Sequence, residues 1–242
     1  MSLICVKPYF RSFLFCSLMS LISFSMPSIA AKLTLDQERQ LYDQAQLWLD
    51  DKQVDKYRKV RHQLLAYPLT PYLDYRTMLI DIGNKSPIVV KSFIDTHALI
   101  PFSVTVARSY LNALAAQGKW AVIREFQKNE PSGEQYRCHY YTALYRTGDA
   151  KQAFDGAKKI WLAGHSISNA CDDLFSAWEN RQGISDDLIA ERVTLAFHEN
   201  NRPLMSYLAK KLKTKKNLAY AQHLINLSQQ PQLAETFLRD KH

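Results

Sequence analysis

LNALAAQG (residues 111–118) and YTALYRTG (residues 141–148) are two helix ends of the same design. In each, apolar residues at helical spacing lead to a glycine, and a second helical pattern begins directly afterwards. Glycine readily takes the left-handed conformation that closes a helix, so each stretch predicts a helix followed at once by an antiparallel partner. Gly118 and Gly148 are 30 residues apart, a spacing typical of stacked helix pairs.

The same pattern extends in both directions from these corners. Residues 180–183 and 199–203 punctuate later helices, and apolar stripes run from Leu41 to Leu49, after a cap at Thr34, and over residues 54–65. The β-branched runs lie within helical patterns, so no strand is predicted. We therefore expect an all-α helix-pair solenoid. A compact helical bundle is the alternative.

The composition excludes several classes of protein. The chain has 242 residues, of which 47% are hydrophobic and 12% aromatic, so disorder is not its main state. Only 7 glycines and 9 prolines argue against collagen-like or Pro-rich architectures. The net charge of +8 permits an anionic partner without naming one.

Residues 1–30 have the pattern of an export signal. Lys7 and Arg11 precede an apolar run over residues 12–26, and residues 28–30, Ser-Ile-Ala, resemble a cleavage site. The run is about fifteen residues long, short of the roughly twenty that span a bilayer, which disfavours a membrane anchor. We predict a signal peptide over residues 1–30, an exported chain over residues 31–242, and no membrane span.

Export determines which of the four cysteines remain and whether they are expected to be oxidised. Cys5 and Cys16 leave with the signal, so Cys138 and Cys171 remain. In an oxidising compartment such a pair is expected to form a disulfide. The alternative is a catalytic Cys138 beside His139, but adjacent side chains on a helix point about 100° apart and rarely form a dyad.

The sequence contains no recognisable catalytic or metal-binding motif. It has no H-E-x-x-H, C-x-x-C, G-x-S-x-G or phosphate-binding glycine pattern, and its histidines stand apart from one another. Acidic pairs at residues 172–173 and 186–187 sit where helices are predicted to begin, which suits the helix dipole. We assign no catalytic residue, metal ligand or cofactor.

A run of lysines lies between residues 210 and 216. Five of its seven residues are lysine, but no aromatic side chains interleave for base stacking, and the chain is exported. We therefore expect no nucleic-acid partner. A solvated helix end is the main interpretation, and an anionic glycan or lipid surface is the alternative.

An aromatic corner covers residues 67–76, YPLTPYLDYR. The two prolines should end the preceding helix and fix a rigid turn. Tyr67, Tyr72, Tyr75 and Arg76 have two interpretations that the sequence leaves open. They pack the corner through ring and hydroxyl, or they form a platform for sugar rings on which the arginine meets a carboxylate.

This corner resembles the N-terminal region of the soluble lytic murein transglycosylases. A second block, residues 138–178, is similar to the same family in residue type and spacing, including both cysteines. The resemblance implies a right-handed α-superhelix, a helix-pair solenoid with TPR-like packing that forms an incomplete ring. It also implies a periplasmic protein that acts on peptidoglycan.

Family members cleave the MurNAc–GlcNAc bond to leave a 1,6-anhydromuramoyl end, using one glutamate and no cofactor. That glutamate lies in an E-S context, followed by G-L-M-Q and A-Y-N strings. None of these strings occurs between Ala31 and His242. We therefore expect residues 31–242 to be the N-terminal part of the superhelical domain, without the lysozyme-like catalytic domain, so whether this chain is itself an enzyme stays open.

Two hypotheses follow for function. The first is a truncated or partial transglycosylase that engages peptidoglycan as a scaffold, with a separate polypeptide carrying the rest of the superhelix and the catalytic domain. The second is a periplasmic helical-repeat adaptor that binds a protein partner.

Overall fold

The computed structural model describes residues 33–230 and residue 232. These residues form twelve α-helices and three short 3₁₀ helices and contain no β-strand, which confirms the all-α prediction. None of these helices combines the length and the apolar character needed to cross a membrane. The export signal predicted over residues 1–30 lies outside the described residues.

The α-helices are, in chain order, α1 (Leu35–Asp50), α2 (Val54–Val60), α3 (Thr70–Leu79), α4 (Pro87–Thr96), α5 (Phe102–Ala116), α6 (Trp120–Phe126), α7 (Glu134–Arg146), α8 (Ala150–Trp161), α9 (Asp172–Glu179), α10 (Asp186–His198), α11 (Arg202–Ala209) and α12 (Lys215–Gln229). The 3₁₀ helices are η1 (Arg61–Leu64), η2 (Ile82–Asn84) and η3 (Asn169–Cys171).

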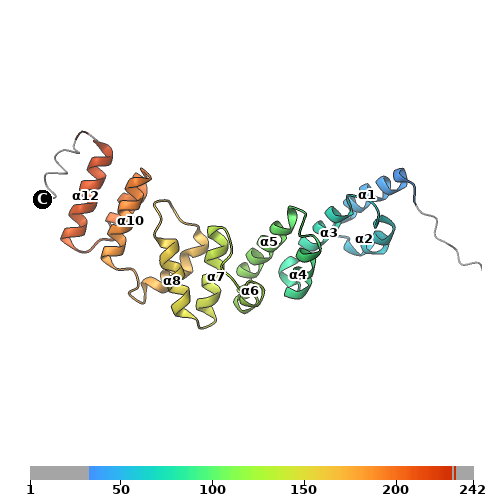
Figure 1. The fold of residues 1–242 in the computed structure, drawn as a ribbon, viewed down its shortest axis with the longest axis horizontal. Helices are drawn as coiled ribbons and strands as arrows, with labels where there is room; N and C mark the ends of the chain where they lie inside the picture. Colours follow the sequence, from blue (N-terminus) through green and yellow to red (C-terminus); the bar gives the residue numbers. More distant parts are fainter. Residues whose placement is uncertain (1–32, 231, 233–242) are drawn as a thin grey trace, which may run out of the picture.

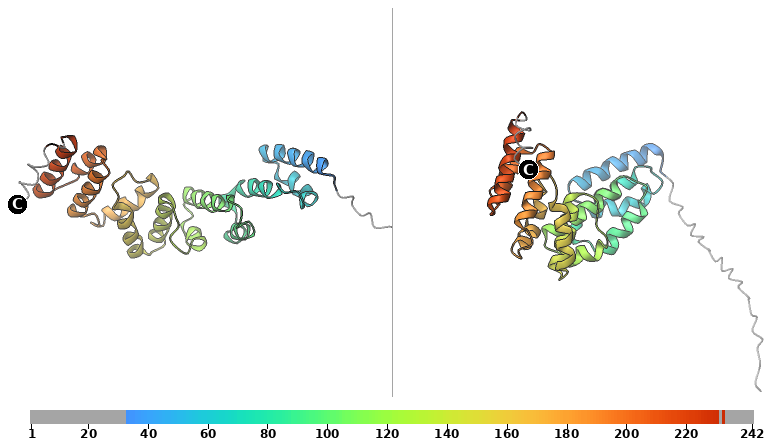
Figure 2. Two further views of the ribbon diagram at one scale, coloured as in Figure 1. Left: turned by 45° about the horizontal axis from the view of Figure 1, so that its top comes forward. Right: turned by 60° about the vertical axis from the view of Figure 1, so that its left-hand side comes forward.

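The helices follow one another along an elongated, curved row. Figure 1 places α1 at one end and α12 at the other, and the two further views in Figure 2 show the same order. The main contacts join helices that are one or two positions apart in the chain, such as α7 with α8, α4 with α5, and α10 with α11 and α12. This is the packing of a solenoid, and the compact bundle is therefore not observed.

The core divides into three clusters along the row. The first surrounds Tyr57 where α1, α2 and α3 meet, and the second surrounds Tyr110 on α5. The third and largest extends from Cys138 on α7 to Ile225 on α12. Because no single centre collects the apolar side chains, each part of the stack depends on its neighbours for burial.

The predicted glycine corners are confirmed in detail. Gly118 and Gly148 have φ angles of 66° and 98°, in the left-handed region. The residue after each glycine donates its backbone N–H to a carbonyl of the helix that has just ended, Leu114 in one case and Leu144 in the other, at 2.9 Å. These are Schellman closures, which satisfy carbonyls that the helix end leaves free.

Three further corners use the same closure without glycine. Lys52, Gln182 and Asn200 have φ angles of 59°, 59° and 54°. At the corner predicted over residues 180–183, the left-handed residue is therefore Gln182 and not Gly183. Gly183 is needed for a different reason, since a Cβ there would lie 1.9 Å from Nε1 of Trp178.

The first two apolar stripes form helices with one difference. Thr34 caps α1 in a reciprocal capping box with Gln37, as the sequence indicated. The second stripe does not continue as one helix, because α2 ends at Val60 and the chain tightens into η1. This change of pitch buries Leu64 completely and leaves Leu65 65% exposed.

Asp186 joins α10 to the start of α12. Its carboxylate accepts hydrogen bonds from the backbone N–H of Lys213 at 2.6 Å, from the Thr214 hydroxyl at 2.5 Å and from the Asn217 amide at 2.9 Å. The hydrogen bond from the Thr214 side chain, followed by that from the Lys213 backbone, lowers the pKa of Asp186 to about 2. The acidic pair at residues 186–187 therefore does more than complement a helix dipole.

This clamp predicts a pH-dependent effect of Asp186→Asn. A folded-state pKa below the unfolded value gives stability that is present above about pH 4 and is lost as the pH falls toward about 2. The variant should therefore melt at a lower temperature than the parent near pH 6. The difference between the two melting temperatures should decrease as the pH falls from about 4 toward about 2. Thermal unfolding followed by circular dichroism measures it.

The matched control is Asp155→Asn, which removes a surface ion pair with Lys151, a residue with a 92% exposed side chain. That change should alter the unfolding free energy by less than about 0.5 kcal/mol. A melting gap for Asp186→Asn that stays constant across the acidic range would show that the carboxylate charge does not hold α10 and α12 together.

Candidate functional site

The aromatic corner at residues 67–76 turns the chain from η1 into α3. Thr70 begins α3, with Pro71 in its first turn, and its hydroxyl donates to the Leu64 carbonyl at 2.5 Å. The ring of Tyr67 packs on Tyr42 of α1, with the centroids 5.2 Å apart. Burial, followed by the proximity of Tyr67, raises the pKa of Tyr42. The corner is therefore a packed junction between α1 and α3.

The other three candidate residues of this corner have different surroundings. Tyr75 stacks on Phe102 of α5 at 4.7 Å, and Tyr72 meets the edge of the same ring at 5.5 Å. Arg76 donates to the carboxylate of Asp50 and to the Gln46 carbonyl at the end of α1. Of the four, Tyr72 is the most open to an external ligand, with 48% of the residue exposed.

Asp74, between these residues, organises the same junction. Its carboxylate accepts two hydrogen bonds of 2.6 Å from the Arg61 guanidinium and one of 2.7 Å from the Tyr57 hydroxyl. Burial and then the hydrogen bond to Asp74 raise the pKa of Tyr57. The bidentate geometry fixes α3 against α2 and η1, and sequence reasoning missed it because its partners lie 13 and 17 residues away.

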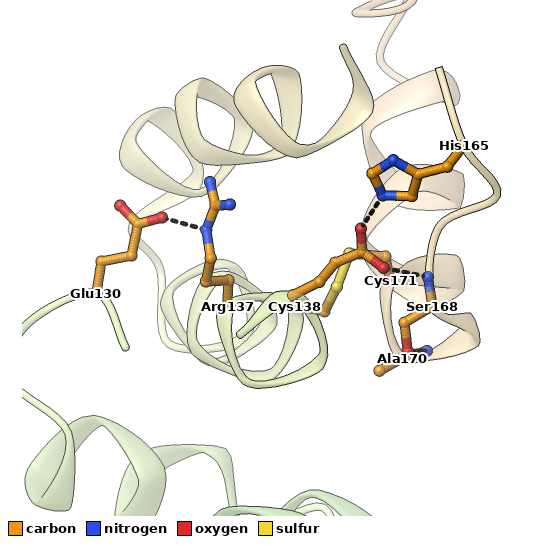
Figure 3. Close-up of a disulfide and its surroundings, with 8 residues drawn as sticks. Glu130, Arg137, Cys138, His165, Ser168, Ala170 and Cys171 are labelled. Carbon is orange, nitrogen blue, oxygen red and sulfur yellow. Dashed lines mark hydrogen bonds and ion pairs between the residues drawn. A yellow bond between two sulfur atoms is a disulfide. The ribbon is translucent and has the colours of Figure 1, made fainter. Parts of the chain in front are cut away.

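The second block of the sequence, residues 138–178, contains a disulfide. Cys138 and Cys171 are bonded, with their Cα atoms 4.8 Å apart, which confirms the predicted pair and excludes Cys138 as a free nucleophile in this state. Figure 3 shows the bond where α7 faces η3. His139 instead lies 3.1 Å from Asn112 through Nε2, and burial lowers its pKa.

Glu134 reinforces the disulfide from the first turn of α7. Its carboxylate accepts from the Ser168 backbone N–H at 2.7 Å and contacts Nε2 of His165 at 2.9 Å. Burial alone would raise the pKa of Glu134, but these hydrogen bonds outweigh it and lower the pKa. The segment before η3 is thus held to α7 by both a covalent and a polar link.

A cavity lies among α8, the loop after it, α9, α10 and α11. Its volume is about 590 Å³, and its walls include apolar and aromatic residues such as Trp161, Phe175 and Tyr207. Polar and charged side chains also line it, namely Ser166, Asp172, Ser176, Glu179, Arg192 and Lys211. A cavity of this size is within the usual range for small-ligand sites.

Arg192 is the buried charge of this cavity, with 4% of the residue exposed. Its guanidinium stacks on the Trp161 ring at 4.2 Å and donates to the carbonyls of Ala163 and His165 at 3.2 Å. Burial lowers its pKa to about 10. Sequence reasoning missed Arg192. Its burial could have been predicted, because it lies on the apolar face of α10 with Leu188, Ile189, Val193 and Ala196.

The lysine run at residues 210–216 covers the turn between α11 and α12 and the first two residues of α12. Lys211 lies 3.4 Å from Glu179 and 5.5 Å from the Tyr207 ring centroid, and the backbone of Lys213 contacts Asp186. Part of the run therefore joins the solenoid together. Among the residues that the structure describes, no group of three or more His, Cys, Asp or Glu side chains is arranged to hold a metal ion.

Known proteins share both the sequence and the fold of this chain. It is 33% identical over 216 residues to "Soluble lytic murein transglycosylase" of Escherichia coli strain K12, and the alignment covers 89% of this chain and 33% of that protein. The protein of the same description from Salmonella typhimurium is 35% identical over 177 residues, or 73% of this chain and 27% of its own length.

The chain is similar over most of its length to part of the soluble lytic murein transglycosylases. The solved 70-kDa soluble lytic transglycosylase, in complex with bulgecin A, superposes with a TM-score of 0.71 at 32% identity, over 85% of this chain and 33% of that one. An inactive mutant of lytic transglycosylase Slt from Pseudomonas aeruginosa gives a TM-score of 0.71 at 27% identity, over 82% and 32%. The resemblance seen in the sequence is thus confirmed.

The chain spans about a third of the length of these transglycosylases. A family model described as "Cucumovirus coat protein" also matches, over residues 151–238. That match covers only about a third of the chain, and the part of it that the structure describes belongs to the same helical row as the rest. It therefore carries no argument about function.

The disulfide gives a stability prediction within this transglycosylase-like fold. Replacing both cysteines, Cys138→Ser with Cys171→Ser, removes a cross-link between residues 33 apart. The chain-entropy relation then predicts a loss of about 3–4 kcal/mol in unfolding free energy. Urea unfolding of the purified protein measures it.

Reduction of the parent protein is the matched control, because it should reproduce the loss without changing the sequence. The oxidised parent should also have an intact mass two hydrogens below the reduced protein. Ready alkylation of Cys138 and Cys171 in the native oxidised protein would contradict the assignment.

Proposed function

We propose that residues 31–242 form the N-terminal superhelical part of a lytic transglycosylase, which engages peptidoglycan and positions a catalytic domain. The observation that carries this proposal is the 33% identity to a soluble lytic murein transglycosylase across 89% of the chain. The solenoid supports it, because stacked helix pairs offer an extended, rigid surface to a long polymer. Without Lys7 and Arg11, residues 31–242 keep 29 of the 31 basic residues against all 23 acidic ones, and this net charge of +6 suits a polymer whose peptides bear carboxylates.

Cleavage of the MurNAc–GlcNAc bond, in this proposal, is performed by a glutamate outside residues 31–242. None of the strings that surround the family's catalytic glutamate occurs in that range, and we assign no catalytic residue within it. The lysozyme-like domain would be contributed by another part of the protein or by a separate polypeptide. The superhelical part would then act by binding and orientation, which lower the entropic barrier to reaction.

The proposed compartment is the periplasm. The signal pattern over residues 1–30 supports export, and the Cys138–Cys171 disulfide is the bond expected in an oxidising compartment. The adaptor hypothesis, in which the solenoid binds a protein, is not favoured, because the similarity to transglycosylases extends over most of the chain.

Tyr72 is the residue of the aromatic corner that we propose meets glycan. It is exposed beside Tyr75 and Phe102, so a sugar face could lie on a ring that its neighbours hold in place. Tyr67, Tyr75 and Arg76 would support the corner from behind through their contacts to Tyr42, Phe102 and Asp50.

Sacculus binding tests the proposal. The purified chain should be retained on peptidoglycan sacculi, and Tyr72→Ser should reduce its retention by about threefold to tenfold if one aromatic contact to sugar is lost. Leu218→Ser is the matched control, because Leu218 on α12 is 46% exposed and its replacement should leave retention unchanged. The pelleted fraction at several ionic strengths provides the measurement.

Absence of retention at low ionic strength would overturn the proposal. If Tyr72→Ser and Leu218→Ser reduced retention equally, Tyr72 would not be the residue that meets glycan. The purified chain should release no 1,6-anhydromuropeptides from sacculi under conditions in which an active transglycosylase releases them. Their formation by the purified chain would instead place a catalytic carboxylate within residues 31–242.

A further inference from the structure

The guanidinium of Arg192 carries a buried charge without an anionic partner. Two of its nitrogens, Nε and Nη2, donate to the backbone carbonyls of Ala163 and His165, and Nη1 forms no hydrogen bond within the described residues. No carboxylate of those residues forms an ion pair with it. Burying an arginine away from water is costly unless an anion or a full set of hydrogen bonds compensates.

The acidic side chains around the cavity are engaged elsewhere. Glu179 pairs with Lys211 at 3.4 Å, and Glu134 is held by His165 and Ser168. Asp172 is exposed on the first turn of α9, where the positive end of the helix stabilises it. The cavity therefore has a cation in its buried part that none of these carboxylates contacts, and Glu134 favours its charge only through space.

The walls of the cavity suit an organic ligand better than a bare ion. Trp161 and Tyr207 bring aromatic rings to its lining, together with Phe175 and Pro203. The indole N–H of Trp161 is buried beside the arginine, without a hydrogen-bond acceptor among the described residues. Nη1 and the second hydrogen of Nη2 remain as a planar pair of donors, which matches the two oxygens of a carboxylate.

We propose that this cavity binds a carboxylate carried by a small sugar or peptide group, with Arg192 holding the carboxylate and the ring of Trp161 or Tyr207 packing on the rest. The choice of ligand rests on the proposed function, since peptidoglycan offers carboxylates of two kinds. One is the lactyl group of N-acetylmuramic acid, and the other is the C-terminus of a peptide stem. The shared chemistry is the carboxylate, and the two sources are separated by experiment.

Matched ligand pairs test the proposal on the unmodified protein. N-Acetylmuramic acid and the amide of its lactyl group differ only in the carboxylate, and N-acetyl-D-alanyl-D-alanine differs from its C-terminal amide in the same way. The indole N–H resonance of Trp161, assigned with Trp161→Phe, reports binding in a titration of the isotope-labelled protein. The acid of at least one pair should shift this resonance and bind at least about tenfold more tightly than its uncharged partner.

Arg192→Gln should weaken binding of that acid by about tenfold or more, because the charge-assisted hydrogen bonds are lost. Arg58→Gln is the control, since Arg58 is an exposed arginine on α2, with a 62% exposed side chain, and its loss should change nothing. If Arg192→Gln fails to fold, the matched ligand pairs still decide the question. Equal binding of acid and uncharged partner, or no shift of Trp161, would overturn the proposal and leave Arg192 as a structural bridge.

The sacculus assay separates this inference from the proposed function. Retention on sacculi without any shift of Trp161 would overturn the cavity site and leave the function standing. Acid binding at Trp161 without retention on sacculi would sustain the cavity site and overturn the function. A response to the muramic acid pair assigns the lactyl source, and a response to the dipeptide pair assigns the peptide source.

Discussion

A helix pair in a solenoid has an apolar face that only the next pair can bury, and the rest of this structure depends on that constraint. It requires corners that reverse the chain within a few residues, which the Schellman closures at Gly118 and Gly148 provide. It also requires close helix approach. At Gly156 on α8, an added Cβ would lie 2.0 Å from the buried ring of Tyr141 on α7, so the α7–α8 contact depends on the missing side chain.

Polar links then fix how successive pairs are placed. Asp74, Glu134 and Asp186 are carboxylates that each accept several hydrogen bonds from the neighbouring element, so each joins two steps of the stack. Hydrogen bonds to a carboxylate are stronger than neutral ones and directional, which suits them to setting orientation. Arg192 departs from this pattern, because its contacts are neutral carbonyls and an aromatic ring.

The sequence predicted what local periodicity and turn chemistry control. Helical spacing and the corners at Gly118 and Gly148 predicted the solenoid, and the two cysteines outside the predicted signal peptide predicted the disulfide. The corner at residues 180–183 was predicted, but its left-handed residue, Gln182, was not, because a left-handed conformation at a non-glycine residue leaves no clear signal. The burial of Arg192 follows from its position on the apolar face of α10, but its cavity and the Asp74 clamp depend on which helix faces touch. No pattern within one helix contains that information.

The central claim is that this chain is an extended stack that holds its shape through contacts between neighbouring helix pairs. Small-angle X-ray scattering of the purified, oxidised protein tests it most directly. A compact domain of about 200 residues would have a radius of gyration near 16 Å. The stack predicts a clearly larger value and a distance distribution with a long tail. A value near that of a compact domain, with a symmetric distribution, would contradict it.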